Sequence, residues 1–213
     1  MNRRNFISSI LAPAPVVALA STHQPQPASA SALGLTGRAA IPNVRVTSQA
    51  GKSYRFYDDL VKGKMVAINF FYARCNGVCP RMTANLLKVQ QQLRERVGDR
   101  VGRDIFLYSI SLKPEEDTPG HLAAYARMHG IRPDSGWLLL RAKREDAELL
   151  RRRLGFVDSD PVLDADIDQH TGMVRLGSDV YDKWSACPAM GPAYAIVDSL
   201  LWSDLTLPRR GYE

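Results

Sequence analysis

The N-terminal part of the sequence lacks an apolar run long enough for a membrane-spanning helix. Its apolar stretch covers residues 7–20 and is interrupted by Pro13 and Pro15, whereas a spanning helix needs about 20 consecutive apolar residues. Acidic side chains are missing from positions 1–32, and no internal repeat is visible. These absences exclude a spanning helix in this stretch and a repeat architecture for the chain.

A strong excess of one charge is also missing. The chain carries 28 Lys and Arg against 22 Asp and Glu, a net charge of +6. Arg3 and Arg4 are the only Lys or Arg at positions 1–32, so the remainder is close to +4. This balance does not provide the dense basic surface of a nucleic-acid-binding protein. We interpret the basic run at residues 151–153 as the solvated face of a helix.

The segment at positions 1–32 has the three parts of an export signal. A basic start is followed by the short apolar stretch, and the segment ends in alternating Ala and Ser at residues 28–32. Arg3 and Arg4, followed by Phe6 and Ile7, are typical of the twin-arginine variant, which exports folded proteins. We expect a periplasmic protein with no stable membrane span after cleavage, or a membrane-associated protein if the signal is retained.

The rest of the chain is long enough for one domain with a full core. Gly34, Gly37 and Pro42 interrupt any periodicity before residue 44. We predict the following division: export signal 1–32, linker 33–43, a single domain 44–205 and a tail 206–213.

From residue 44 onward, strand and helix patterns alternate. Residues 65–72 are almost continuously apolar, which is typical of a strand buried on both faces. After Pro80, apolar residues recur at spacings of three and four, which predicts a helix. Further strands are predicted at 105–112, 137–140 and 173–176, helices at 118–129, 145–154 and 192–201, and a β-hairpin at 44–47 and 52–56. This order predicts an α/β domain whose central sheet is covered by helices.

The chain has only three cysteines, Cys75, Cys79 and Cys187. In an oxidising compartment, an odd number leaves at least one thiol outside any intramolecular disulfide. Cys75 and Cys79 follow the buried strand directly and precede Pro80, which suits the first turn of a helix. We therefore expect Cys79 at or near the N-cap, where unpaired N–H groups and the helix dipole favour a thiolate.

Thiolates in this position can bind a metal or exchange disulfides. Two soft thiolates suit Cu(I) or zinc, and an added imidazole suits Cu(II) as well. A redox pair is usually spaced Cys-x-x-Cys, whereas three residues separate Cys75 from Cys79. The spacing also allows a structural disulfide or two unrelated core cysteines, so these residues alone leave the choice open.

Residues 70–80, FFYARCNGVCP, are similar to the Sco/SenC family pattern of an aromatic strand that ends in Cys-x-x-x-Cys-Pro. Other segments agree with the family in the same order: residues 43–60, 62–64, 109–111 and 114–119. The resemblance covers about residues 42–177. It implies a single thioredoxin-like domain, with a central mixed β-sheet, helices on both faces and an N-terminal β-hairpin extension.

Members of this family bind copper through the two motif cysteines and a distant histidine. The resemblance therefore implies that Cys75, Cys79 and His170 are ligands of Cu(I) or Cu(II), because His170 precedes a Thr where the family's ligand histidine precedes Ser or Thr. It also implies a copper chaperone rather than a turnover enzyme, delivering copper to, or maintaining the thiols of, the binuclear copper site of cytochrome c oxidase. The expected partner is a copper-acceptor protein, either an oxidase subunit or another copper chaperone.

The sequence departs from the family pattern at two positions. Gln169 stands directly before His170 where the family usually has Asp, with Asp168 one residue further back. Lys113 stands where the family commonly has Asp. Because carboxylates near a metal orient its ligands and tune its charge, these departures bear on affinity, redox potential and the choice of partner.

The remaining soft or imidazole donors are weaker candidates. His23 falls in the expected signal, and His121 and His129 fall in a helical pattern. Cys187 and Met190 can approach a metal or relay it, but we favour a packing role for both.

The alternative function is enzymatic, a thiol–disulfide oxidoreductase. Cys75 or Cys79 would attack a partner's disulfide and the other cysteine would resolve the mixed disulfide. No peroxidase signature surrounds either cysteine. A ligand role for His170 separates the two functions.

Overall fold

The computed structural model describes residues 37–167 and 172–207. Its helices are η2 (Arg38–Ala40), η3 (Phe56–Val61), α1 (Val78–Val97), η4 (Gly98–Arg100), α2 (Pro119–Met128), α3 (Arg144–Arg153), α4 (Pro161–Ala165) and α5 (Ala193–Trp202). Its strands are β1 (Arg45–Ser48), β2 (Ser53–Arg55), β3 (Met65–Phe71), β4 (Ile105–Ser111), β5 (Trp137–Arg141), β6 (Met173–Ser178) and β7 (Lys183–Pro188). The predicted division at residues 32 and 43 stays a prediction, because most of that region lies outside the described residues.

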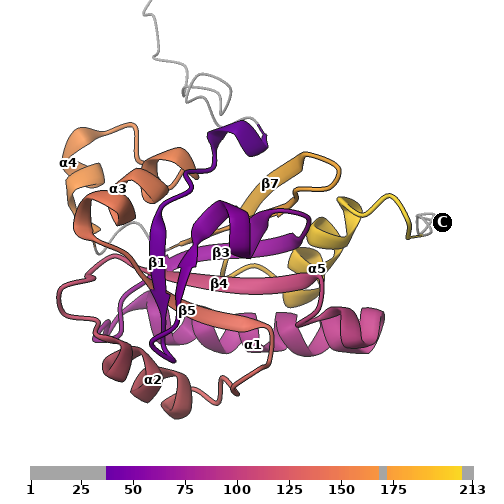
Figure 1. Ribbon diagram of the computed structural model, residues 1–213, viewed down its shortest axis with the longest axis horizontal. Coiled ribbons are helices and arrows are strands. Elements are labelled where there is room, and N and C mark those ends of the chain that lie inside the picture. The colour runs from indigo at the N-terminus through magenta and orange to yellow at the C-terminus, as the bar shows by residue number, and fades with distance from the viewer. Residues whose placement is uncertain (1–36, 168–171, 208–213) are drawn as a thin grey trace, which may run out of the picture.

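The strands form one sheet in the order β2-β1-β5-β4-β3-β6-β7 (Figure 1). The central strands β3, β4 and β5 run parallel, and the outer strands join them antiparallel. The predicted hairpin is β1 and β2, paired antiparallel at one edge. The sheet is therefore mixed, as expected from the sequence.

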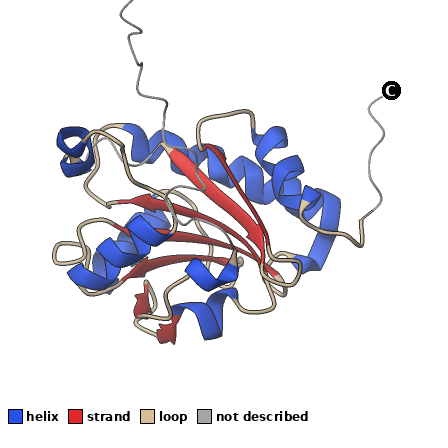
Figure 2. Ribbon diagram, turned by 90° about the horizontal axis from the view of Figure 1, so that it is seen from above, coloured by secondary structure: helices blue, strands red, loops and turns tan. Residues whose placement is uncertain are grey.

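The apolar run in β3 has two buried faces, as its sequence predicts. Met65, Ala67 and Phe71 belong to a core cluster shared with α1, α2 and α5. Val66, Ile68 and Phe70 belong to a second cluster on the opposite face, shared with η3 and α3. Helices thus cover both faces of the sheet (Figure 2), which confirms the predicted fold class.

Several short elements were not predicted, among them α4 and β7. α4 has five residues and begins with Pro161, and the Asp160 carboxylate caps it by accepting a hydrogen bond from Val162 N at 2.8 Å. β7 is an edge strand that pairs with β6, and its partial exposure leaves no apolar periodicity to detect. Within residues 37–167 and 172–207, no helix has both the length and the apolarity that a membrane crossing requires.

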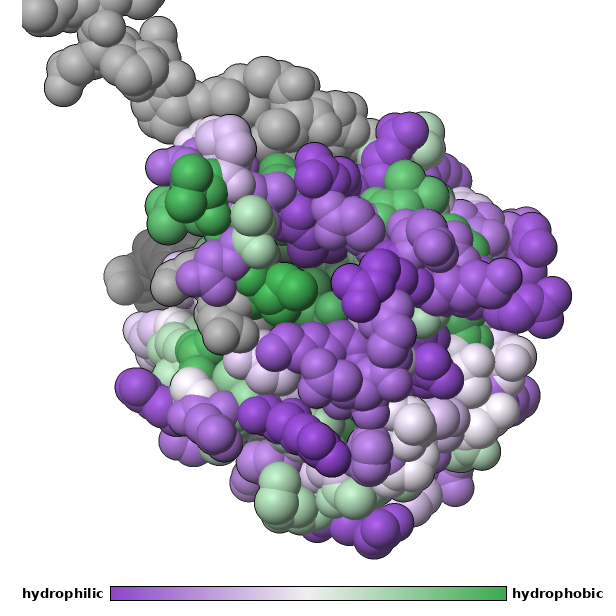
Figure 3. Space-filling view, turned by 90° about the vertical axis from the view of Figure 1, so that its left-hand side faces the viewer, coloured by the Kyte–Doolittle hydropathy of each residue, from purple (hydrophilic) through white to green (hydrophobic). Residues whose placement is uncertain are grey.

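A cavity of roughly 530 Å³ opens beyond the end of β4, between α3 and α4. In Figure 3, this side of the molecule shows mostly hydrophilic residues around a hollow with an apolar floor. The apolar residues lining the cavity are Leu112, Pro114, Ala147, Pro161, Ala165 and Ile167. Ile167 also packs against the core cluster that contains Cys75 and Cys79, so the cavity adjoins this cluster.

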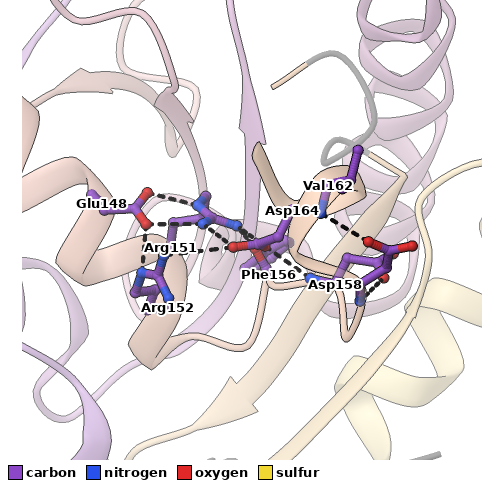
Figure 4. A network of polar contacts seen from close by, with 8 residues as sticks. Glu148, Arg151, Arg152, Phe156, Asp158, Val162 and Asp164 are labelled. Carbon is purple, nitrogen blue, oxygen red and sulfur yellow. Dashed lines mark hydrogen bonds and ion pairs between the residues drawn. The ribbon is translucent and has the colours of Figure 1, made fainter. Parts of the chain in front are cut away.

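Arg151 forms one wall of this cavity and is buried, with 4% exposure (Figure 4). Its guanidinium donates two hydrogen bonds to Glu148, at 2.7 and 2.9 Å, and two to Asp164, at 2.7 and 2.9 Å. It also donates to the Phe156 carbonyl at 2.6 Å. The interpretation of residues 151–153 as a solvated face is therefore wrong at Arg151, because its charge ties α3 to α4.

Replacement of Arg151 by Ala should strongly destabilise the fold. The variant would leave Asp164, whose side chain is 12% exposed, as a largely buried charge without its main partner, and breaking a buried pair costs about 3–5 kcal/mol. Urea denaturation followed by circular dichroism measures the change. Arg153→Ala, at an exposed position of the same helix, should stay within about 0.5 kcal/mol of the parent protein; equal effects of the two changes would contradict this role of Arg151.

Candidate metal centre

Cys75 and Cys79 lie at the junction between β3 and α1. β3 ends at Phe71, and α1 begins at Val78 with Gly77 as its N-cap. Cys79 therefore lies in the first turn, two residues after the N-cap, which agrees with its expected place at or near the N-cap. The first N–H groups of the helix consequently lie near Cys75, which precedes the N-cap.

The Cys75 sulfur is the acceptor of a convergent set of hydrogen bonds. The Cys79 thiol, the backbone N–H groups of Cys79 and Gly77, and the Tyr72 hydroxyl all donate to it. Both cysteines are free thiols, with 8% exposure at Cys75 and none at Cys79. Because the two sulfurs are in hydrogen-bond contact, one soft metal ion can reach both, so the pair fits half of a thiolate metal site.

The same hydrogen bonds favour the charged form of Cys75. Burial raises the pKa of the Cys75 thiol, but the donors from Cys79, Gly77 and Tyr72 outweigh burial and leave that pKa below its usual value. Burial without such donors raises the pKa of Cys187. The sequence-based expectation of an activated thiolate is therefore met at Cys75.

A buried carboxylate holds the loop that carries Cys75. Asp117 is 2% exposed and accepts hydrogen bonds from Ala73 N, at 3.1 Å, and from Ser111 Oγ, at 2.5 Å. Ser111 Oγ in turn accepts from Lys113 N at 3.0 Å. Asp117 thus joins the segment after β3 to the segment after β4. It was not singled out from the sequence, although an acidic residue between Ser111 and a helix start at Pro119 was visible.

A second polar network lies inside the sheet and reaches α1. Trp137 Nε1 donates to Ser109 Oγ at 3.0 Å, and Ser109 Oγ donates to Asn69 Oδ1 at 2.7 Å. Asn69 Nδ2 then reaches Met82 Sδ of α1 at 3.6 Å. The network fixes α1 against β3, β4 and β5. Its sequence signal was the presence of Asn69 and Ser109 within otherwise apolar strands.

The third predicted ligand, His170, lies outside the described residues, as do Asp168 and Gln169. Its role as a ligand stays a prediction. Within the described parts of the chain, no three His, Cys, Asp or Glu side chains are grouped so as to hold a metal ion. Neither His121 nor His129 therefore completes a site with the two cysteines.

The remaining candidates have local contacts. His121 Nδ1 is 2.6 Å from the Glu116 carbonyl, and His129 packs on the Tyr125 ring. Cys187 is half-buried in β7 and packs against the core cluster that contains Cys75 and Cys79. The favoured packing role of Cys187 agrees with this placement, whereas the packing role favoured for Met190 is wrong, because Met190 is 40% exposed.

Alkylation should distinguish Cys75 from Cys187 by its pH dependence. Because only the thiolate reacts, the midpoint of the rate–pH curve follows the thiol pKa. The midpoint should lie below the usual thiol range at Cys75 and above it at Cys187. Iodoacetamide labelling at a series of pH values, with the modified sulfur assigned from fragment masses, measures both in one sample; coincident midpoints would refute the assigned difference.

Replacement of Asp117 by Ala should loosen the Cys75 loop. The N–H of Ala73 and the hydroxyl of Ser111 would lose their acceptor, at about 1–3 kcal/mol for each buried group. We expect a loss of about 2–4 kcal/mol in the free energy of unfolding, measured by urea denaturation, together with a higher alkylation midpoint at Cys75. Glu116→Ala, at the exposed neighbouring position, is the control, and a midpoint unchanged in Asp117→Ala would contradict the anchoring role.

Comparison with known proteins identifies the relatives of this chain. The SCO1/SenC family model matches residues 36–134. A SCO1 protein homolog of Bacillus subtilis (strain 168) is 27% identical over 88 residues, which are 41% of this chain and 42% of the relative. The match thus spans less than half of the curated relative's length.

Solved structures agree with the fold over most of the described chain. A SCO1/SenC family lipoprotein of Bacillus anthracis str. Ames has a TM-score of 0.60 at 24% identity, covering 76% of this chain and 94% of the other. BsSco, described as a Sco family cytochrome c oxidase assembly protein with a disulfide switch, has a TM-score of 0.59 at 21% identity, covering 75% and 90%. Arabidopsis thaliana ScoI with copper bound has a TM-score of 0.57 at 17% identity, covering 77% and 97%.

These matches confirm the resemblance inferred from the cysteine motif and its flanking segments. Residues 36–134 contain both motif cysteines and the Asp117 anchor, and the fold similarity extends over most of the chain. Residues 36–134 therefore match the SCO1/SenC family, and the chain has the thioredoxin-like fold of its structural relatives.

Proposed function

We propose that this chain is a copper chaperone that holds one copper ion through Cys75, Cys79 and His170. The observation that carries the proposal is the buried, reduced Cys75–Cys79 pair, whose sulfurs are in contact at the start of α1. Two soft sulfur donors with a lowered pKa at Cys75 fit Cu(I), and an imidazole extends the fit to Cu(II). Copper is the cargo of this site, not a resident cofactor.

The donors around Cys75 prepare the pair for a cation. The backbone N–H groups of Gly77 and Cys79 hold the sulfur of Cys75 in place before any ion arrives, because they belong to the fixed first turn of α1. The Cys79 thiol donates to Cys75 and must lose its proton when both sulfurs become ligands. Copper uptake therefore releases a proton, and the cysteine pair must be reduced to offer thiolates.

Transfer follows from the small number of ligands. Three protein donors leave copper open to attack, so the ligands of an acceptor can replace the protein's own one at a time. The proposed acceptor is a subunit of cytochrome c oxidase or another copper chaperone. This assignment is supported by the match of residues 36–134 to the SCO1/SenC family and by relatives described as copper-bound or as cytochrome c oxidase assembly proteins.

We also propose that the chain works after export. Positions 1–32 carry the twin-arginine-like pattern, and the Bacillus anthracis relative is described as a lipoprotein. A protein placed outside the cytosol needs a reductant for its thiols before it can bind Cu(I), since oxidising compartments favour the disulfide.

The second candidate is a thiol–disulfide oxidoreductase that uses Cys75 and Cys79. The lowered pKa of Cys75 favours it, because the thiolate is the attacking species in disulfide exchange, and the BsSco relative is described as having a disulfide switch. This function needs the two cysteines only. A requirement for His170 would favour copper binding.

Copper binding should be lost in His170→Ala and in each of Cys75→Ser and Cys79→Ser. The reduced protein, titrated with Cu(I) against a competing chelator, should bind one ion per chain, because two thiolates alone leave the ion incompletely held. We expect each variant to lose more than about tenfold in affinity, because loss of the lesser, outer-shell partners of metal ligands already costs about 10–100-fold.

Matched controls separate ligand loss from general damage. His121→Ala removes an exposed imidazole and Cys187→Ser removes the thiol outside the pair, and both should bind copper like the parent protein. Full copper affinity in His170→Ala would overturn the three-ligand site. No competitive binding by the parent protein would overturn the copper proposal and leave the oxidoreductase candidate.

A further inference from the structure

A lysine ammonium lies over the aromatic ring that hydrogen-bonds Cys75. Lys113 Nζ is 4.1 Å from the centroid of the Tyr72 ring, and the Tyr72 hydroxyl donates to the Cys75 sulfur. A cation over a ring face is attracted to the ring's electrons and strengthens the hydroxyl as a donor by drawing charge from it. Lys113 is therefore coupled to Cys75 through Tyr72.

The backbone holds this arrangement in place. Leu112 N donates to the Phe71 carbonyl at 2.8 Å, one residue before Tyr72. Lys113 N donates to Ser111 Oγ at 3.0 Å, and the same hydroxyl is bonded to Asp117, which also holds the Cys75 loop. Lys113 and Tyr72 thus belong to two segments that are bonded to each other on both sides of the ring contact.

Only two contacts separate the ammonium from Cys75: its approach to the Tyr72 ring and the hydrogen bond from the Tyr72 hydroxyl to the Cys75 sulfur. Tyr72 is 8% exposed, so most of the intervening space is protein and the charge is incompletely screened by salt. The Asp117 carboxylate also lies near the loop, but its oxygens accept hydrogen bonds from Ala73 and Ser111. A change at Lys113 therefore alters the local charge against a constant background.

We propose that Lys113 is a positioning residue that acts through Tyr72 to bias the Cys75–Cys79 pair toward its reduced state and bound copper toward Cu(I). The inference concerning copper rests on the proposed copper site; the inference concerning the cysteines does not. A stronger hydroxyl donor at Tyr72 stabilises the Cys75 sulfur of the reduced pair more than the sulfur of a disulfide, which is the weaker hydrogen-bond acceptor. The lysine charge also disfavours Cu(II) more than Cu(I), because the divalent ion has the larger positive charge.

The first test uses the metal-free protein in glutathione buffers at one fixed pH. The pair loses two electrons and two protons to glutathione disulfide, which becomes two glutathione thiols, and the Cys75–Cys79 disulfide is counted by mass after alkylation. Lys113→Met keeps the apolar stem but removes the charge. It should move the equilibrium toward the disulfide by about three- to tenfold. This corresponds to a reduction potential of the cysteine pair that is ~14–30 mV more negative than in the parent protein.

Three further variants separate charge from packing. Lys113→Arg keeps a cation over the ring and should retain the parent potential. Lys52→Met removes an equivalent lysine, 5.1 Å from the Tyr54 ring in the β1–β2 hairpin, and should also retain it. Tyr72→Phe removes the hydroxyl, and adding Lys113→Met to it should shift the potential less than Lys113→Met does alone.

The second test compares Cu(I) and Cu(II) affinities in the same variants by chelator competition. Lys113→Met should strengthen Cu(II) binding relative to Cu(I) by about three- to tenfold, or ~28–59 mV for the one-electron copper couple. Lys113→Arg and Lys52→Met should leave the ratio unchanged.

The outcomes distinguish this inference from the proposed function. Parent-like values for Lys113→Met in both tests, or equal shifts in Lys113→Met and Lys113→Arg, would overturn the role of the lysine charge. If copper binds but only the metal-free potential shifts, the copper part of the inference fails and the chaperone proposal stands. If no copper binds to the parent protein, the proposed function fails, and the metal-free potential still decides whether Lys113 acts on the cysteines.

Discussion

The bond between the buried Asp117 carboxylate and the Ala73 N–H is the contact on which the geometry of the cysteine pair depends. β3 and β4 run parallel from Met65 and Ile105 onward, so their carboxyl ends reach the same edge of the sheet together. The chain must leave both strands there without regular pairing, and unsatisfied backbone groups at such an edge are costly. Asp117 satisfies one of them and connects both exits, which gives the Cys75 loop a fixed path into α1.

The position of the helix start decides which cysteine is activated. Because α1 begins at Val78, the N–H groups of Gly77 and Cys79 are free to donate to the sulfur that precedes the helix. Cys79, inside the first turn, faces the core and is fully buried. The two cysteines therefore have different roles: the Cys75 sulfur accepts several hydrogen bonds, and the Cys79 thiol donates one of them. Such asymmetry suits both metal uptake and disulfide chemistry, which explains why the geometry of the pair alone does not separate the two functions.

Much of the fold could be predicted because its signals are periodic. The buried strand β3 and the apolar face of α1 were predicted correctly from the sequence, and the cysteine motif at their junction indicated the candidate metal centre. The short elements could not be predicted, since α4 has only five residues and β7 is half-exposed. Arg151 was misread because a run of arginines carries no sign of which member meets Asp164, a contact made only when α3 and α4 pack together. His170 remains a prediction that rests on motif order.

The placement of Lys113 shows how a change at a distance from the ligands can act on them. The residue lies outside the cysteine loop, yet the hydrogen bond from Leu112 to Phe71 brings its segment beside Tyr72. A carboxylate at this position would place a negative charge over the same ring and favour the higher oxidation state of a bound metal, whereas a lysine favours the lower one. The hydrogen bonds around Asp117 do not depend on the side chain at position 113, because the backbone N–H of this residue is the group that donates to Ser111. The loop geometry and the charge acting on the site are therefore separable, and one can change while the other is kept.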